Sequence, residues 1–360
     1  MTSKIIDIHT HLDKNSKLSL VEALNSHGIL SEYICTYLKF QNKINEFKEL
    51  SDFERARVIY QTMFIDNGPI SKEAVGVAFV IDRFTNMSFE NDYTLRPDKI
   101  NDFEALSNFF DRLNDPEVLG REKILQKTDI GTLFMSNYPL DDLESDDKFK
   151  RVIRTHAFET NEIFQNKFKP EMIAISISGD DFIDCDYIAK LIKNYNVPIH
   201  IFFGAERDVN DKIKSIHQDL GEGIPLESNK RELRKLKRLL CVFDNHKFIL
   251  SNMIESLEME FISLAKNFPN VILAGFWWQM SSPELMKKYL RIRIQELGYN
   301  FIPFFSDAKN YFQLWYRWNN FERIFRDAIL ENSQFNYALN GREESIKQII
   351  NFTNKALRGI

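Results

Sequence analysis

Short apolar segments that alternate with helical patterns are the feature that most constrains the fold of this chain. Within each segment the apolar residues are continuous, which is typical of strands in a parallel sheet that is covered on both faces. The predicted strands are residues 4–9, 130–136, 151–156, 172–178, 197–203, 247–252, 270–276 and 300–306. Together with helices expected at 186–196, 227–241 and 254–268, these eight segments predict a TIM-type (β/α)₈ barrel.

The first two predicted strands are separated by a stretch far longer than an ordinary strand–helix connection. Helical patterns occupy 18–27, 31–40, 51–64 and 100–113, whereas 75–94 fits neither pattern clearly, and Gly28 is expected to end the first helix. Pockets of such barrels lie at the carboxyl ends of the strands. We therefore predict that residues 1–12 and 130–360 form the barrel and that 13–129 form a mainly helical insertion over its C-terminal face.

Composition narrows the classes of function. A net charge of −5 argues against a nucleic-acid partner. The sequence has no apolar run of about 18 residues, which argues against a membrane span, and its first residues lack the apolar core of a signal peptide. The three cysteines, Cys35, Cys185 and Cys241, are odd in number and widely spaced, so we expect a cytoplasmic protein with reduced thiols.

The first strand ends in His9-Thr10-His11. Residues i and i+2 of a strand face the same side, so the two imidazoles are expected to project together and to suit Zn²⁺ or a similar ion. The alternative is a pair of histidines with satisfied hydrogen bonds. The last strand ends in Asp307, which either completes this metal site or serves as a turn or helix-capping residue. The fourth strand has no lysine that could bridge two ions, which favours a single ion.

The positions of the remaining histidines in the predicted fold allow alternatives. His200, in the fifth strand, either points into the barrel or lies against a helix, and His156, at the end of the third strand, either lines the pocket or packs elsewhere. His27, His217 and His246 fall in helical or loop contexts, and we expect them to be structural.

Several short motifs occur in a characteristic order. They are Phe-Met-Ser-Asn-Tyr-Pro-Leu-Asp-Asp-Leu-Glu at 134–144, Phe-Gly-Ala-Glu-Arg at 203–207, Gly-Phe-Trp-Trp at 275–278, Ser-Asp-Ala-Lys at 306–309, Arg317, and Phe-Glu-Arg-Ile-Phe at 321–325. In order and spacing, this part of the chain resembles the uronate isomerases (glucuronate isomerases) of the amidohydrolase superfamily. The resemblance runs from the second strand to about residue 330, besides the His-x-His start, and the paired tryptophans are its most specific mark.

The resemblance implies a distorted (β/α)₈ barrel that holds one divalent ion, usually zinc. The implied activity is aldose–ketose interconversion of a hexuronate such as glucuronate or galacturonate. His9, His11 and Asp307 match the metal-binding positions. The residues that match other motif positions of the family are Arg207 in the strand-five motif, Arg317 in the final motif, and the tryptophan pair Trp277 and Trp278.

The chain also departs from the family, as a divergent and shortened member would. The strand-five histidine of the family falls at Phe202, whereas His200 lies two residues earlier on the same face. The Thr-Phe-Arg-Pro-Asp motif after strand three appears as Thr-His-Ala-Phe-Glu at 155–159, without its arginine. Lys309 replaces an arginine, and Trp318 replaces the histidine after the late arginine. The metal site is therefore better supported than the substrate.

We predict a metal-dependent, uronate isomerase-like enzyme whose ion stabilises the enediolate formed when a proton leaves carbon 2 of a small sugar acid. Asp307, His200 and Arg207 are the expected catalytic residues. The expected substrate-binding residues are Arg207, Arg317, Lys309, Trp277, Trp278 and His156. The cations could instead form ion pairs, and the tryptophans could merely close the barrel mouth. The alternative functions are metal-dependent hydrolysis of an amide, lactone or ester and a non-catalytic barrel scaffold, and homo-oligomerisation is left open.

Overall fold

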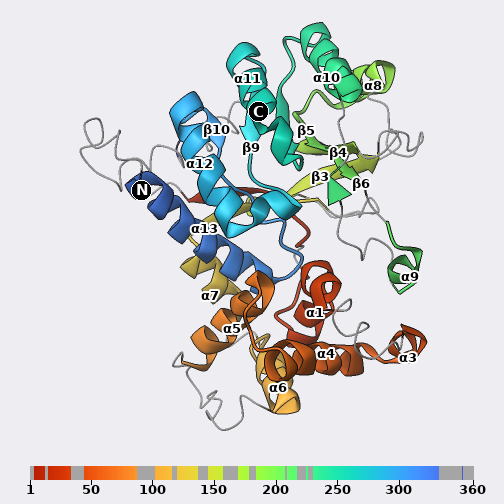
Figure 1. Cartoon of the computed structure of the whole chain (residues 1–360), viewed down its shortest axis with the longest axis vertical. Coiled ribbons are helices and arrows are strands. Elements are labelled where there is room, and N and C mark those ends of the chain that lie inside the picture. The colour runs from red at the N-terminus through yellow and green to blue at the C-terminus, as the bar shows by residue number, and fades with distance from the viewer. Residues whose placement is uncertain are drawn as a thin grey trace.

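The molecule is built around one eight-stranded sheet with the strand order β1-β2-β3-β4-β5-β8-β9-β10 (Figure 1). The computed structural model describes residues 4–12, 15–33, 44–86, 102–115, 120–136, 145–156, 169–177, 184–206, 209–216, 224–225, 230–331 and 351. The strands are β1 (Ile5–Thr10), β2 (Ile130–Met135), β3 (Phe149–His156), β4 (Met172–Ile177), β5 (Ile199–Phe203), β8 (Phe248–Asn252), β9 (Val271–Ala274) and β10 (Phe301–Ile302). All neighbouring strands in this sheet are parallel, and the eight predicted strands are confirmed.

The last strand is short, and the segment that follows it returns to the first strand. β10 contains two residues. Beyond it, the Asp307 amide donates to the His9 carbonyl at 2.9 Å, and the His11 amide donates to the Ala308 carbonyl at 2.7 Å. Thr10 and Ala308 form an isolated parallel bridge. These contacts join the two ends of the sheet, and the fold is a distorted (β/α)₈ barrel, as predicted.

Two apolar clusters lie on the two sides of the strands. The inner cluster includes Ile8, Val152, Ala174, Phe202 and Phe305, and the larger outer cluster joins the strands to the surrounding helices. The helices that follow β4 are α8 (Cys185–Tyr195), α9 (Asp211–Lys214), α10 (Lys230–Val242), α11 (Glu258–Asn267), α12 (Pro283–Leu297) and α13 (Tyr311–Glu331), and a small hairpin pairs β6 (Ala205–Glu206) with β7 (Ile224–Pro225). The helices predicted at 186–196, 227–241 and 254–268 are confirmed as α8, α10 and α11.

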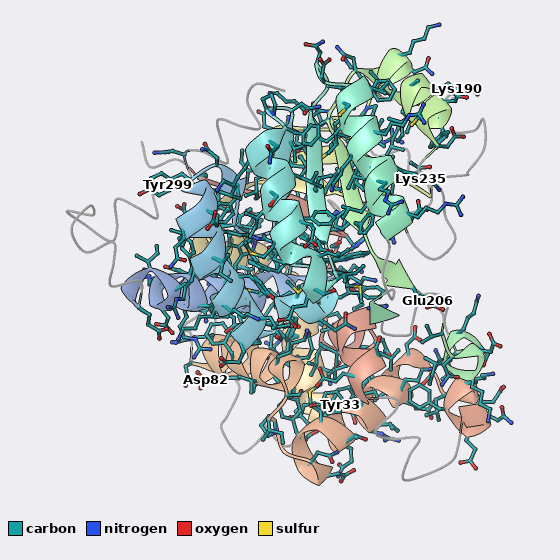
Figure 2. All side chains as sticks on the ribbon, turned by 45° about the horizontal axis from the view of Figure 1, so that its top comes forward. Tyr33, Asp82, Lys190, Glu206, Lys235 and Tyr299 are labelled. Atoms are coloured by element: carbon teal, nitrogen blue, oxygen red, sulfur yellow. The ribbon has the colours of Figure 1, made fainter. Side chains whose placement is uncertain are left out.

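Between β1 and β2 the described part of the chain is helical. Its helices are α1 (Leu20–Leu24), α3 (Ile44–Glu49), α4 (Asp52–Tyr60), α5 (Lys72–Thr85), α6 (Phe103–Arg112) and α7 (Gly120–Lys127), with a π-helical turn at Gln61–Asp66 and a helical segment at 27–33. α1, α3, α4 and α6 gather on one side of the molecule, in red to golden yellow in Figure 1. Tyr33 and Asp82 lie in this part, far from Lys190 of α8 (Figure 2).

This stretch reaches the barrel mainly through α5. Ser71 caps α5 by accepting a hydrogen bond from the Ala74 amide, and Val77, Ile81 and Phe84 form its buried face. That face packs against α13. The division of the chain into a barrel and an insertion at 13–129 stays a prediction, and residues 34–40 and 87–94 of the expected elements lie outside the described part. No helix among the described residues has the length and apolar character needed to cross a membrane.

The prediction that Gly28 ends a helix is wrong. Helix α1 ends at Leu24, and Gly28 lies inside the next helical segment, 27–33. A β-carbon at this position would lie 2.9 Å from Nη2 of Arg317 and 3.2 Å from Nε2 of Gln313. Glycine at this position therefore allows close approach of the α13 side chains rather than ending a helix.

Candidate active site

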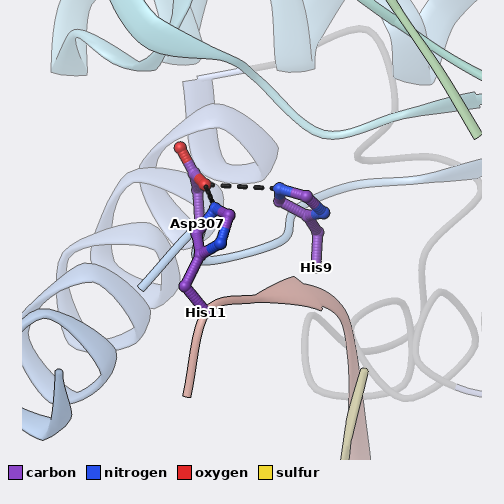
Figure 3. A group of neighbouring side chains, drawn as sticks. All are labelled: His9, His11 and Asp307. Carbon is purple, nitrogen blue, oxygen red and sulfur yellow. Dashed lines mark hydrogen bonds and ion pairs between the residues drawn. The ribbon is translucent and has the colours of Figure 1, made fainter. Parts of the chain in front are cut away.

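Three predicted metal ligands meet at the carboxyl ends of β1 and β10 (Figure 3). Oδ1 of Asp307 lies 3.3 Å from Nε2 of His9 and 3.0 Å from Nε2 of His11. The ligand atoms of all three side chains lie within 4.8 Å of one another. His11 and Asp307 are 296 residues apart in the chain, and the return of the segment after β10 to β1 brings them together.

The two distances from Oδ1 of Asp307 to the imidazole nitrogens suit a small divalent ion. Two donors bound at about 2.0–2.1 Å lie about 3.3 Å apart around a tetrahedral ion and about 2.9 Å apart around an octahedral one. The observed separations of 3.0 and 3.3 Å fall in this range. Three protein ligands also leave coordination positions for water or substrate, as catalytic sites require.

The protonation states also suit a metal ion. Burial lowers the pKa of His11 to about 3, against the opposing effect of Asp307. Burial alone would raise the pKa of Asp307, but the hydrogen bonds and charges of His11 and His9 hold it well below its usual range. At neutral pH the site therefore offers a neutral imidazole at His11 and an ionised carboxylate, the forms that bind metals.

A buried carboxylate beneath the triad, that of Asp7, organises the backbone around the site. It accepts hydrogen bonds from Nε1 of Trp318 at 2.7 Å, from the Ser306 amide at 3.2 Å and from the His9 amide at 3.3 Å. Burial raises the pKa of Asp7, although these donors oppose the shift. The sequence analysis missed this residue, and its signal was a single acid inside an apolar strand.

Arg317 holds the loop that carries Asp307. Its Nη1 donates to the Ser306 and Asp307 carbonyls, both at 2.9 Å, and its Nη2 lies 3.3 Å from Oε1 of Glu73. Burial acts to lower the pKa of Arg317, but the charge of Glu73 raises it above its usual value. Of the alternatives left open for this arginine, the structure shows ion-pair use, and substrate binding by Arg317 stays a prediction.

Two cavities border Asp307. The smaller, of about 40 Å³, is lined by all three triad residues, and the larger, of about 560 Å³, is lined largely by residues of α5 and α13. The residues that line both cavities are His27, Trp278, Asp307 and Lys309. Asp307, one of the candidate metal ligands, therefore borders the larger cavity as well as the smaller one.

Aromatic side chains form one wall of these cavities. The Trp277 ring lies 5.0 Å from that of Phe202 and 5.2 Å from that of Trp278, and His27 stacks on Trp278 at 6.0 Å. Both tryptophans line the smaller cavity. His27 lines both cavities, and the prediction that it is structural stays a prediction. The helical context of His27 gave no sign of this position.

His200 points into the barrel but lies one layer below the cavity. The Ser251 hydroxyl donates to the Ala274 carbonyl, so it accepts from Nε2 of His200 at 2.8 Å. Nδ1 of His200 has no hydrogen-bond partner among the described residues. Burial and the charge of His9 hold the pKa of His200 well below its usual range, so the ring is neutral. Phe202, two residues further along β5, is the residue that lines the cavity, and catalysis by His200 stays a prediction.

An arginine that the sequence analysis overlooked, Arg154, faces the triad. It lines the smaller cavity and shares a face of β3 with Val152 of the inner cluster. Within the described part of the chain, its side chain has no hydrogen bond or ion pair. Packing defines which face of β3 points into the barrel, so no local pattern indicated Arg154.

Some predicted positions fall in parts of the chain that the structure does not describe. Arg207, His217 and residues 137–144 and 157–159 lie outside the described residues. The backbone of His156 pairs with Ser176 at the end of β3, but its side chain also lies outside the described part. Cys185 and Cys241 are free thiols.

The curated proteins whose sequences match this chain are named uronate isomerases. No family model matches the chain. A protein named uronate isomerase from Brucella melitensis is 27% identical over 172 residues, which cover 46% of this chain and 33% of that protein. Uronate isomerases from Brucella canis and Brucella suis match over the same length with the same identity. The match therefore spans about a third of the length of these curated relatives.

Solved structures share the fold over nearly the whole chain. A uronate isomerase from Bacillus halodurans has a TM-score of 0.76 at 19% identity, covering 97% of this chain and 91% of its own. A glucuronate isomerase from Caulobacter crescentus has a TM-score of 0.70 at 14% identity, covering 99% and 91%. The fold is thus the distorted barrel of these isomerases, and the resemblance indicated by the motifs is confirmed.

Proposed function

We propose that this chain is a metal-dependent isomerase that interconverts the aldose and ketose forms of a hexuronate. The observation that carries the proposal is the convergence of His9, His11 and Asp307 beside a cavity that Arg154 and Lys309 also line. This arrangement offers metal ligands and carboxylate-binding cations in one place. The sequence relatives named uronate isomerase support the reaction type.

His9, His11 and Asp307 would hold one divalent ion, and zinc is the identity we propose. When bound, such an ion polarises substrate oxygens and stabilises negative charge that develops on them. The donor spacing and the neutral His11 ring support this assignment.

Isomerisation moves a proton from carbon 2 to carbon 1 and another from the 2-hydroxyl to the carbonyl oxygen. We propose Asp307 as the proton shuttle. Its Oδ1 faces both imidazoles, so Oδ2 is the atom that would take the proton. Its lowered pKa makes this carboxylate a weak base, so a water hydrogen-bonded to it is the proposed relay.

The substrate carboxylate would be held by Arg154 and Lys309, since Arg317 is engaged with Glu73 and two carbonyls. A guanidinium can bind a carboxylate through two parallel hydrogen bonds. Trp277 and Trp278 would pack on the sugar. A binding role for Arg207 rests on the resemblance, and one for His156 rests on its position at the end of β3; both remain part of the proposal.

The test is a ketose-forming assay on zinc-loaded protein with a panel of hexuronates, with His9→Ala as the control. We expect turnover of at least one hexuronate and its loss in the variant. Zinc bound at one equivalent without any ketose would contradict the proposal, and hydrolysis of an amide, lactone or ester by that protein would replace it with the hydrolase alternative.

Arg154 gives a sharper test of the substrate class. Arg154→Ala should lower kcat/KM for the hexuronate by about 10–100-fold, the value of one hydrogen-bonded charge pair, mainly through KM, and Arg154→Lys should restore part of it. The loss should be smaller for the matching neutral hexose. An equal loss for both sugars would show that Arg154 does not bind the carboxylate.

A further inference from the structure

A buried acid of the stretch between β1 and β2 contacts the loop that carries Asp307. Glu73 lies in the first turn of α5 and is 3% exposed. Its carboxylate accepts a hydrogen bond from the Tyr316 hydroxyl and pairs with Nη2 of Arg317 at 3.3 Å. Glu73 and Arg317 are 244 residues apart in the chain. One side chain therefore links α5 to the first turns of α13.

Arg317 transmits this link to the candidate metal ligand. Its other nitrogen, Nη1, donates to the carbonyls of Ser306 and Asp307. Asp307 itself has a positive φ of 49°, which is uncommon for a residue other than glycine. Such a conformation persists only where the surroundings hold it from several sides. Arg317 holds the carbonyl of Asp307, and the His9 carbonyl holds its amide at 2.9 Å.

Two glycines bring the insertion close enough to make this contact. A β-carbon on Gly76 of α5 would lie 2.5 Å from the Tyr316 ring, and one on Gly28 would lie 2.9 Å from Nη2 of Arg317. Neither position can carry a side chain unless α13 or its side chains shift. The contact between the insertion and α13 is therefore closely fitted at the two residues that Glu73 binds.

We propose that Glu73 is a positioning residue that acts through Arg317 to hold Asp307 in place for the metal ion. The proposal rests on the proposed function only in requiring that His9, His11 and Asp307 bind a metal. Through Glu73, the helical stretch between β1 and β2 would help to position Asp307, although no residue of that stretch belongs to the triad. Metal affinity then depends on an acid that does not touch the metal.

The molecule contains a matched control. Glu258 and Arg293 form a second buried pair at 2.6 Å, and Arg293 donates to the Gly275 carbonyl just after β9. This pair also holds the end of a strand, but the residue it holds is not a metal ligand. Loss of the charge of Glu258 should therefore reduce stability without changing metal affinity.

The experiment measures the Zn²⁺ dissociation constant of the full chain by competition with a chromophoric chelator. Residues that support a metal ligand typically contribute about 10–100-fold to affinity, so Glu73→Ala should weaken binding to that extent. Glu73→Gln, which keeps the shape and an acceptor, should weaken it less and serves if the alanine variant does not fold. Glu258→Gln should stay within about twofold of the unaltered chain, because its pair holds Gly275 rather than a candidate metal ligand, while urea unfolding shows its loss of stability.

An unchanged zinc affinity in folded Glu73→Gln and Glu73→Ala proteins would overturn the proposal and leave Glu73 with a packing role only. Equal weakening in the Glu258→Gln control would also overturn it, because the effect would then be general destabilisation. The titration uses no substrate. If no hexuronate is turned over but Glu73→Ala weakens zinc binding, the inference stands and the proposed isomerase function fails.

Discussion

Two arginines hold the carboxyl ends of neighbouring strands, one in the scaffold and one at the site. Arg293 pairs with Glu258 between α12 and α11, and both side chains are fully buried. Arg317 pairs with Glu73 between α13 and α5, with a longer distance of 3.3 Å and an arginine side chain that is 21% exposed. The first pair joins adjacent barrel helices, whereas the second joins the barrel to the helical stretch after β1.

The comparison shows that a buried Arg–Glu pair can either stabilise the scaffold or position the candidate site. Burying an ion pair costs desolvation, and apolar replacements are often as stable, so such pairs are best understood by what they position. Arg293 also lies over the Phe276 ring at 4.2 Å and is enclosed on all sides. Arg317 borders the larger cavity and grips the loop of a candidate ligand. We therefore expect changes at the first pair to alter stability and changes at the second to alter the site.

The largest effect on activity should come from a change of Asp307, the candidate ligand whose loop is held by the Arg317–Glu73 pair. Asp307→Asn keeps the shape but removes the charge that binds the ion. Because a bound ion is worth several kcal/mol of transition-state stabilisation, kcat/KM should fall by about 10³-fold. Steady-state kinetics at fixed zinc concentration measure this, with urea unfolding as the control for folding. Retention of activity within tenfold would remove Asp307 from the proposed mechanism.

The Arg293–Glu258 pair should instead affect stability. Arg293→Ala leaves Glu258 buried without its partner, which typically costs about 3–5 kcal/mol of unfolding free energy. Arg291→Ala, on the same helix but in an exposed pair with Glu331, should cost at most about 1 kcal/mol. Urea titrations of both variants give the comparison. Similar losses of unfolding free energy in the two variants would show that the buried pair stabilises the fold no more than the exposed pair does.

The contact between α5 and α13 can be tested without touching either charge. Gly76→Ala places a methyl group against the Tyr316 ring, and such overpacking typically costs about 1–3 kcal/mol. Val75→Ala, at the neighbouring half-exposed position, should change stability by less than about 0.5 kcal/mol. Thermal and urea unfolding measure both. A Gly76→Ala protein as stable as the unaltered chain would mean that the two helices are not so closely packed.

The smallest effect concerns pH. The pKa of His11 is lowered from 6.5 to about 3 in the folded protein. Between pH 6.5 and 3, His11 is therefore protonated in the unfolded chain but neutral in the folded one. The contribution of His11 to the free energy of unfolding is therefore fully present above pH 6.5 and is lost as the pH falls toward 3. One proton corresponds to about 1.4 kcal/mol per pH unit, or up to about 2 kcal/mol between pH 6.5 and 5. His11→Asn should flatten the pH dependence of unfolding of the metal-free protein by that amount, and an unchanged slope would contradict the lowered pKa.

The sequence predicted the barrel and the triad because both depend on local patterns combined with topology. Continuous apolar runs marked the strands, and a closed parallel barrel must bring the end of its last strand beside the end of its first. Asp307 therefore had to approach His9 and His11, whatever the intervening helices did. The helical stretch did not disturb this inference because it begins after β1 and ends before β2.

The supporting residues could not be predicted in the same way. Glu73 resembles any first-turn helix acid, and its partner lies 244 residues away on another helix. Gly28 resembles a helix end because its neighbour, Arg317, is invisible to local patterns. Arg154 was hidden as one cation in a strand whose inward face only the structure defines. Side-chain partnerships of this kind depend on packing between distant elements rather than on periodicity.

The most direct test of the central claim is proton NMR of a hexuronate incubated in D₂O with the zinc-loaded protein. Isomerisation through an enediolate should form the ketose and introduce solvent deuterium at the carbon that exchanges its proton, and the His9→Ala protein should do neither. Bound zinc with neither ketose nor deuterium in any hexuronate would contradict the account.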